Sequence, residues 1–181
     1  MQDHPSRREI GPLAALGGAA ALAAIAAPAA AQASARPVRV SPEDRFGILD
    51  LFAEYSWYYD CSDAEAYASL FTEDGAIEAF GSEAARGREN IATFIRTLFV
   101  QRGEQIWQHH TDHLLFFGGR GAYTVYSYWS LLKGSAQTQE YGVMGVGYYV
   151  SDCVKQSGRW LLKKRGIHRW NSARPPWAPA P

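Results

Sequence analysis

The stretch from Glu140 to Asn171, EYGVMGVGYYVSDCVKQSGRWLLKKRGIHRWN, predicts two long strands joined by a short turn. Valine, tyrosine, tryptophan and isoleucine, which favour extended backbone, recur through both halves of the stretch. The tripeptide QSG interrupts the apolar pattern at its middle, as the turn of a hairpin does. We therefore expect strands over residues 140–155 and 159–171 that pair antiparallel.

Two further strands are expected immediately upstream. Residues 111–117 and 122–132 are rich in aromatic and apolar side chains, and the tetrapeptide GGRG between them is typical of a tight turn. A polar loop, KGSAQTQ, separates them from the first pair. Four strands that follow one another through short connections predict an antiparallel meander.

Helical spacing dominates the part of the chain that precedes these strands. Ser41 and Pro42 are typical of a helix cap and a first helical position, and the apolar residues after them recur at spacings of four and three. We expect a long first helix that ends at Asp60. A short helix over residues 63–70, a short strand over 76–80 and a third helix after residue 87 should follow.

Helices followed by a long sheet predict the α+β class. We expect a cone-shaped α+β barrel, in which three N-terminal helices pack on a curved antiparallel sheet. The mouth of such a cone is a natural place for a small ligand.

Three segments divide the chain. Residues 1–35 combine the pair Arg7 and Arg8, an apolar run of alanine and glycine, and small residues at A-x-A spacing, which predicts a twin-arginine export signal and a periplasmic protein. A membrane anchor is the alternative, but alanine and glycine bury little area, so we expect no stable membrane insertion. Residues 36–171 then form one domain, and residues 172–181 a proline-rich tail.

Charge and composition narrow the classes of partner. The formal net charge is zero, and no basic stripe indicates nucleic acid. The chain holds 6 Trp, 10 Tyr and 8 Phe, which favours a pocket for an aromatic or otherwise flat small molecule. Its two cysteines, Cys61 and Cys153, are far apart in sequence, and we expect free thiols.

The stretch WQHHTDHLLFF, Trp107 to Phe117, places three histidines within five residues. A metal site is disfavoured, because the spacing fits no zinc pattern, and we expect no metal. A general base is a second possibility, since a buried carboxylate such as Asp60 can fix the tautomer of a neutral imidazole. Plain packing of the histidine, with Asp60 ending its helix, is the third, and the residues alone leave it open.

The order of these motifs resembles the SnoaL-like branch of the nuclear-transport-factor-2-like superfamily. The resemblance runs from about Phe46 to Trp170 and is carried by YSWYYDCSDAEAYASLFTEDGAI, RGRENIATFI, QHHTDHLLFF and GVGYYVSDCVKQSGRWLLKKRGIHRW. This branch includes scytalone dehydratase, bile acid 7α-dehydratase, hexachlorocyclohexane dehydrochlorinase, ketosteroid isomerases and sphingomonad diarylpropane lyases.

The resemblance implies a cofactor-free pocket built round an Asp–His pair. It assigns the pair to Asp60 and His110, or to His109 if the register shifts by one residue. It adds Tyr55 and Arg169 as further catalytic residues that stabilise developing negative charge. As residues that bind substrate, we expect His109, Trp107, Tyr59, Tyr128, Trp129 and Tyr148.

The function that the resemblance implies is that of a lyase acting on a small aromatic or polycyclic substrate without a cofactor. Dehydration and deformylation by carbon–carbon cleavage are both compatible with one general base. A ketosteroid-type isomerase and a non-catalytic binder of a hydrophobic ligand are the alternatives. We further expect a homo-oligomer.

Overall fold

The computed structural model describes residues 36–119, 121–170 and 175–178. The predicted export signal, residues 1–35, lies outside the described residues, as does most of the predicted tail. Within the described ranges, no helix is long and apolar enough to cross a membrane.

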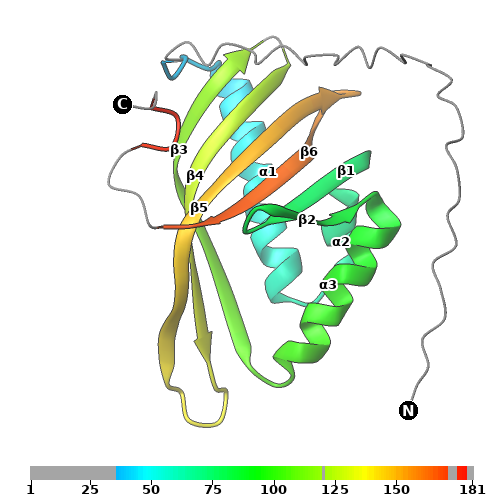
Figure 1. The fold of residues 1–181 in the computed structure, drawn as a ribbon, viewed down its shortest axis with the longest axis vertical. Coiled ribbons are helices and arrows are strands. Elements are labelled where there is room, and N and C mark those ends of the chain that lie inside the picture. The colour runs from blue at the N-terminus through cyan, green and yellow to red at the C-terminus, as the bar shows by residue number, and fades with distance from the viewer. Residues whose placement is uncertain (1–35, 120, 171–174, 179–181) are drawn as a thin grey trace, which may run out of the picture. The chain divides into compact units, whose positions relative to one another are not determined.

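The described elements form one curved sheet with three helices on its concave side (Figure 1). The strand order is β2-β1-β6-β5-β4-β3, so β2 and β3 are the two edges and the sheet does not close. In chain order the elements are α1 (Pro42–Asp60), α2 (Ala64–Ser69), β1 (Phe71–Ala79), β2 (Ser82–Arg86), α3 (Arg88–Arg102), β3 (Ile106–Gly119), β4 (Ala122–Gly134), β5 (Tyr141–Gln156) and β6 (Arg159–Arg169). The α+β class and the three helices on a curved sheet are confirmed.

Two details differ from the expectation. The strand β2 was not expected, because its sequence SEAAR has no apolar alternation to mark it. The strand β1 starts earlier than predicted and pairs with β6 in parallel, so the sheet is mixed rather than wholly antiparallel. The meander β3-β4-β5-β6 is antiparallel throughout, as predicted.

The helix α1 provides the side of the core that faces the sheet. Its N-terminus is capped as the sequence predicts, with the Ser41 hydroxyl accepting from the Asp44 N–H at 3.1 Å. The buried face of α1 packs into the main core cluster with side chains from the inner face of the sheet. That buried face consists of Ile48, Leu51, Phe52, Tyr55 and Tyr59.

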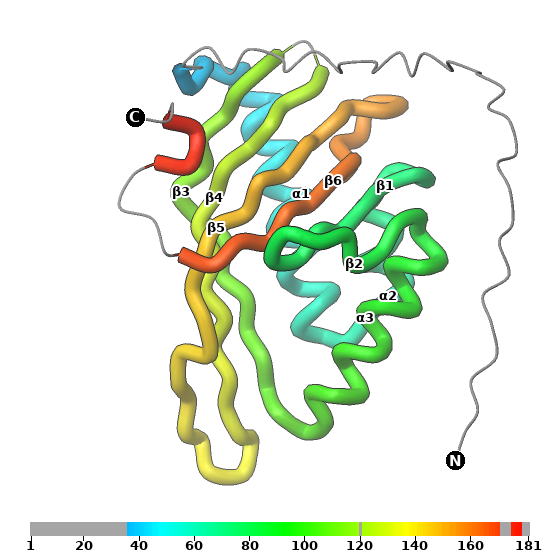
Figure 2. Tube along the Cα trace, in the orientation of Figure 1, coloured from blue at the N-terminus to red at the C-terminus, as the bar shows by residue number. Residues whose placement is uncertain are grey.

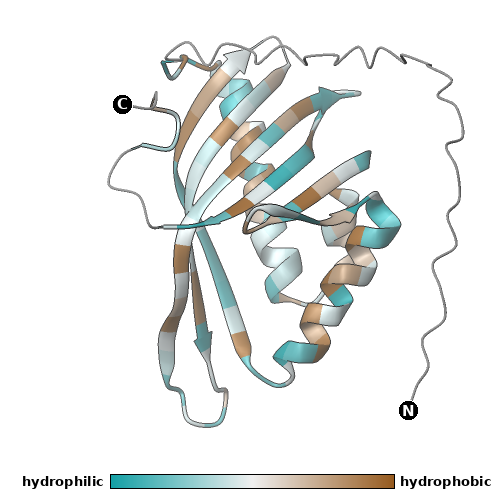
Figure 3. Cartoon of the chain, in the orientation of Figure 1, coloured by the Kyte–Doolittle hydropathy of each residue, from teal (hydrophilic) through white to brown (hydrophobic). Residues whose placement is uncertain are grey.

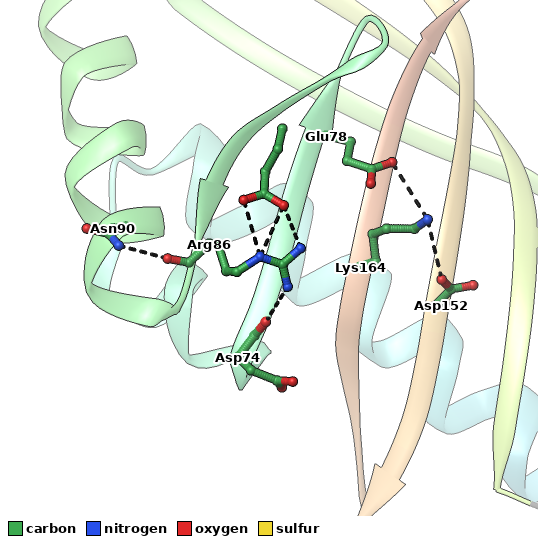
Figure 4. Close-up of polar contacts among 7 residues, drawn as sticks. Asp74, Glu78, Arg86, Asn90, Asp152 and Lys164 are labelled. Carbon is green, nitrogen blue, oxygen red and sulfur yellow. Dashed lines mark hydrogen bonds and ion pairs between the residues drawn. The ribbon is translucent and has the colours of Figure 1, made fainter. Parts of the chain in front are cut away.

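The outer face of the sheet is polar near β6, whereas its inner face is apolar apart from buried polar side chains such as Arg165 and Ser151. Lys164 lies between two carboxylates, with Nζ 3.7 Å from Glu78 of β1 and 3.8 Å from Asp152 of β5 (Figure 4). The next residue, Arg165, points to the other face and is fully buried. Successive side chains of a strand point to opposite faces, and this alternation of polar and apolar residues marks the long strands (Figure 3).

The two cysteines are free, as expected. Cys61 is exposed after the end of α1, and Cys153 is buried in β5. Burial raises the pKa of the Cys153 thiol to about 12, so this thiol stays protonated near neutral pH.

Gly147 of β5 leaves room for the ring of Trp129, whose Nε1 donates to the backbone oxygen of His168 at 3.1 Å. A Cβ atom there would lie 2.0 Å from the backbone oxygen of His168 and 2.6 Å from the ring of Trp129. We expect Gly147→Ala to lower the free energy of unfolding by about 1–3 kcal/mol, because backbone must move to make room. Urea denaturation measures the change.

Gly142 on the same strand is the matched control. A Cβ at Gly142 would have no neighbour within 4 Å. Gly142→Ala should therefore stay within about 0.5 kcal/mol of the parent protein. Equal effects of the two substitutions would contradict the packing described for β5.

Candidate active site

A carboxylate and an imidazole meet where the end of α1 reaches the edge strand β3. The ring nitrogen Nδ1 of His109 lies 3.1 Å from Oδ1 of Asp60. The backbone N–H of His109 also donates to the two carboxylate oxygens, at 3.1 and 3.0 Å. The pair is largely buried, with side-chain exposures of 10% for His109 and 17% for Asp60.

The expected partner of Asp60 was His110, and this assignment is wrong by one residue. Strand β3 already includes residue 106, so side chains alternate between the two faces from Ile106 to Asp112, and His109 and His110 point to opposite faces. His109 points inward to α1, whereas His110 pairs across the outer face with Ser130 of β4 and is exposed. The alternative register, with His109 as the partner, is the one that the structure contains.

The pair has a defined tautomer as long as Asp60 is ionised. A carboxylate only accepts hydrogen bonds, so Nδ1 of His109 must carry the proton that it donates to Asp60. The other ring nitrogen, Nε2, then has a free lone pair, and it forms no hydrogen bond with the described residues. This arrangement is that of a general base supported by a carboxylate.

The buried Arg102 of α3 holds the end of α1 that carries Asp60. Its Nη1 donates to the backbone oxygens of Tyr59 at 3.1 Å and Asp60 at 3.4 Å. Its Nη2 donates to the hydroxyl of Ser62. A cation at a helix C-terminus offsets the partial negative charge of the last carbonyls, which is where the Asp60 carboxylate also lies.

Aromatic rings surround the pair. The Tyr59 ring meets the His109 ring edge-on, with centroids 4.6 Å apart, and stacks on the Trp107 ring at 6.1 Å. Burial raises the pKa of the Tyr59 phenol above its ordinary value. The phenol is therefore a hydrogen-bond donor and not an anion at neutral pH.

A fully buried arginine lies deeper on the inner face, at a position that the sequence did not single out. The guanidinium carbon of Arg165 is 3.7 Å from the ring centroid of Tyr149 and 4.0 Å from that of Tyr55. Its Nη1 donates to the hydroxyl of Ser151 at 3.0 Å, but Nε and Nη2 have no hydrogen-bond partner among the described residues. Because arginine stays charged at ordinary pH, this interior carries a positive charge held by aromatic faces.

The structure separates the other predicted residues. Tyr55 is buried on the inner side beside Arg165, and Trp129 is also on the inner face, where its ring lies 6.0 Å from that of Tyr149. Arg169 is exposed at the end of β6, with its guanidinium 4.7 Å from the ring of Phe80.

Tyr128 and Tyr148 lie on the outer face, opposite the side that carries His109. They pair with each other across β4 and β5, and Tyr128 also pairs with Asp112 of β3. His113 neighbours them, exposed and with a left-handed backbone at φ 54°. These side chains cannot touch a molecule held between His109 and α1.

No group of three or more potential metal ligands occurs among the residues that the structure describes. The polar groups on the inner face are donors and acceptors: the imidazole and carboxylate of the pair, the Tyr59 phenol beside them and, deeper in the domain, the buried guanidinium of Arg165. Such a set suits proton transfer and the stabilisation of negative charge.

Comparisons of sequence and of structure relate this chain to known proteins. The sequence model of the SnoaL-like domain matches residues 41–166. Comparison with curated proteins gives no match. Among solved structures, a variant of Rv3472 from Mycobacterium tuberculosis, a protein of unknown function, is 26% identical, with a TM-score of 0.64 over 72% of this chain and 73% of that one.

Two further solved structures share the fold. ActVI-ORFA from Streptomyces coelicolor is 22% identical, with a TM-score of 0.64 over 70% of this chain and 97% of that one. A protein from Novosphingobium aromaticivorans, provisionally named a scytalone dehydratase, is 21% identical, with a TM-score of 0.60 over 70% and 83% of the two chains.

The hydrogen bonds of Arg102 to the end of α1 predict a large loss of stability when this side chain is truncated. Arg102→Met leaves the backbone oxygens of Tyr59 and Asp60 without these donors, and we expect a cost of about 2 kcal/mol or more. Arg96 on the same helix is the matched control, because its ion pair with Glu65 is exposed. Arg96→Met should cost less than about 1 kcal/mol. Urea denaturation of both variants compares them, and equal costs would show that Arg102 does not hold the helix end.

Proposed function

Because the chain belongs to the SnoaL-like domain family, we propose that it is a cofactor-independent lyase that acts on a small aromatic or polycyclic molecule. The observation that carries the proposal is the pair formed by Asp60 and His109 on the inner side of the sheet. In this proposal, His109 is the proton acceptor and Asp60 fixes its tautomer.

The geometry of the pair supports the role of each residue. Three contacts between His109 and Asp60, from the ring and from the backbone N–H, fix the imidazole relative to the end of α1. The carboxylate also stabilises the imidazolium that forms when Nε2 takes a proton. A histidine is suited to this task near neutral pH because its ordinary pKa is about 6.5.

Two lyase reactions follow from one such base. In a dehydration, Nε2 removes a proton from carbon, and the C–H electron pair forms a double bond as the neighbouring C–O bond breaks. The imidazolium returns its proton to the leaving oxygen, so that the hydroxyl leaves as water. In a deformylation, Nε2 removes the proton of a hydroxymethyl group. The carbon–carbon bond then breaks, formaldehyde leaves, and the remaining carbon keeps the electron pair until it is protonated. Both reactions develop negative charge on the substrate.

Arg165 is better placed than Arg169 to stabilise that charge. Arg165 is inside the domain, and its Nε and Nη2 have no hydrogen-bond partner in the described part of the chain, whereas Arg169 is exposed at the end of its strand. A preorganised cation in an interior of low dielectric acts strongly on a developing charge. Tyr55 contacts the same guanidinium, and we propose that the two residues together stabilise that charge.

Two of the structural relatives support the proposal. The Novosphingobium protein carries the name of a dehydratase, and ActVI-ORFA shares the fold at similar identity. The same fold hosts many functions, so the proposal depends on the Asp60–His109 site and not on the likeness alone.

Incubation of the protein with a panel of aromatic diols and sterols, followed by mass spectrometry of the products, identifies the reaction. Loss of water supports a dehydratase, and loss of formaldehyde supports a deformylase. Conversion without a change of mass would indicate an isomerase, and no conversion across the panel would favour a non-catalytic binder.

With a substrate in hand, His109→Ala should lower turnover by at least ~100-fold, the range typical for loss of a general base. Asp60→Asn keeps the shape but favours the wrong tautomer, so we expect it to be severe as well. The double variant should be little worse than the worse single one, because the two residues act as a unit.

His110→Ala is the matched control, since this side chain is exposed on the opposite face of the same strand. It should keep most of its turnover, and circular dichroism should show all variants folded. A dead His110→Ala beside an active His109→Ala would overturn the assignment of the base.

A further inference from the structure

Two buried hydroxyls lie on the inner face of the sheet, the face that carries His109. Thr111 follows His109 by two residues on β3, and it pairs with Trp129 of β4. Ser127 precedes Trp129 by two residues on β4, so these side chains all point to the same face. The helix α1 packs along β3 on this side (Figure 2). The hydroxyls of Thr111 and Ser127 therefore face the layer that contains α1.

These two hydroxyls differ from most buried hydroxyls in having no partner. The oxygen atoms of Thr111 and Ser127 are buried, and neither forms a hydrogen bond with any of the described residues. Ser127 is only 2% exposed. Burying a hydroxyl without a hydrogen bond costs free energy, and buried hydroxyls normally have partners. A polar oxygen atom of a bound molecule would remove this cost at both positions.

Both residues line a cavity whose inner part lies between α1 and the sheet. This inner part is lined by Leu49 of α1, Thr111 and Leu114 of β3, and Ser127 of β4. The whole cavity has a volume of about 780 Å³, in the range of pockets for drug-sized ligands, and it also reaches residues of the outer face. A change of side-chain rotamer moves a serine or threonine oxygen without moving the backbone, so each hydroxyl can turn from the wall toward the cavity.

The spacing along β3 relates the hydroxyls to the proposed base. A strand rises about 3.3 Å per residue, so the backbone positions of His109 and Thr111 are about 7 Å apart. A pair of fused six-membered rings has a length of this order. A flat molecule of that size with an oxygen at each end therefore suits the space between the imidazole and the hydroxyls.

We propose that Thr111 and Ser127 form a polar subsite that binds a second oxygen atom of the substrate, remote from the atom that reacts at His109. A hydroxyl both donates and accepts, so this oxygen belongs to a hydroxyl or a carbonyl group. The inference rests on the proposed function, because it takes His109 as the base. It narrows the substrate class to flat molecules of at least two fused rings with oxygen atoms at both ends.

Urea denaturation of the ligand-free protein tests whether the two hydroxyls lack partners. Thr111→Val and Ser127→Ala should keep or raise the denaturation midpoint, because each removes a buried hydroxyl without breaking a hydrogen bond to the described part of the chain. Thr124→Val is the matched control and should lower the midpoint, since the Thr124 hydroxyl donates to Asp152 at 2.8 Å. Losses in Thr111→Val and Ser127→Ala as large as the loss in Thr124→Val would overturn the inference.

Calorimetric titration of the full chain with naphthalene-2,6-diol and with 2-naphthol tests binding. The two probes share one ring system and are mostly neutral at pH 7, but only the diol reaches His109 and the polar subsite at the same time. We expect the diol to bind the parent protein at least about tenfold more tightly, the value of one or two net hydrogen bonds. In the double variant Thr111→Val with Ser127→Ala, this advantage should fall below about threefold, whereas Thr124→Val should keep it.

Turnover separates failure of this inference from failure of the proposed function. If His109→Ala stays active, or no compound of the panel reacts, while the diol loses its advantage in the double variant, the lyase proposal fails and the polar subsite stands. If His109→Ala is inactive while the double variant binds the diol like the parent protein, the base stands and the polar subsite is overturned. No binding of the diol to the parent protein would also overturn the polar subsite.

Discussion

The hydrogen bonds between Asp60 and His109 join the two layers of the domain. Asp60 is the last residue of α1, and β3 is an edge strand whose N–H groups on one side have no neighbouring strand. The carboxylate accepts a hydrogen bond from one of these N–H groups, that of His109. It accepts a second hydrogen bond from Nδ1 of the His109 ring. An exposed edge is a liability for a sheet, and here one carboxylate covers part of it and also orients an imidazole.

The placement of this carboxylate has a cost that neighbouring residues offset. Negative charge at the C-terminus of a helix is unfavourable, and burial adds to the cost. Arg102 supplies a cation to the same helix end, and its guanidinium also lies 4.9 Å from the ring of Phe99. The helix α3 therefore contributes to the site indirectly. Its Arg102 holds the end of α1 that carries Asp60, and Asp60 in turn orients His109.

Most of the architecture could be predicted from local patterns, and the errors have local physical causes. The cap at Ser41 and the apolar spacing that follows it located α1, and the turn QSG located the last hairpin. The histidine assignment failed by one residue, because a strand of period two puts neighbours on opposite faces and the sequence does not show which one faces α1. Arg165 was missed because Leu161 and Leu162 are both buried, which hides the alternation of β6. The parallel pairing of β1 leaves no local mark at all.

The parallel pairing of β1 with β6 affects the order in which the sheet can assemble during synthesis. Of the described strands, β6 comes last in sequence, yet it lies inside the sheet between β1 and β5. Residues 71–79 can therefore pair with β6 only after the ribosome has added residues 159–169. Contacts between segments so distant in sequence close large loops, which slows folding. The nascent chain thus cannot join β1 to the β3-β4-β5 part of its sheet until β6 has left the ribosome.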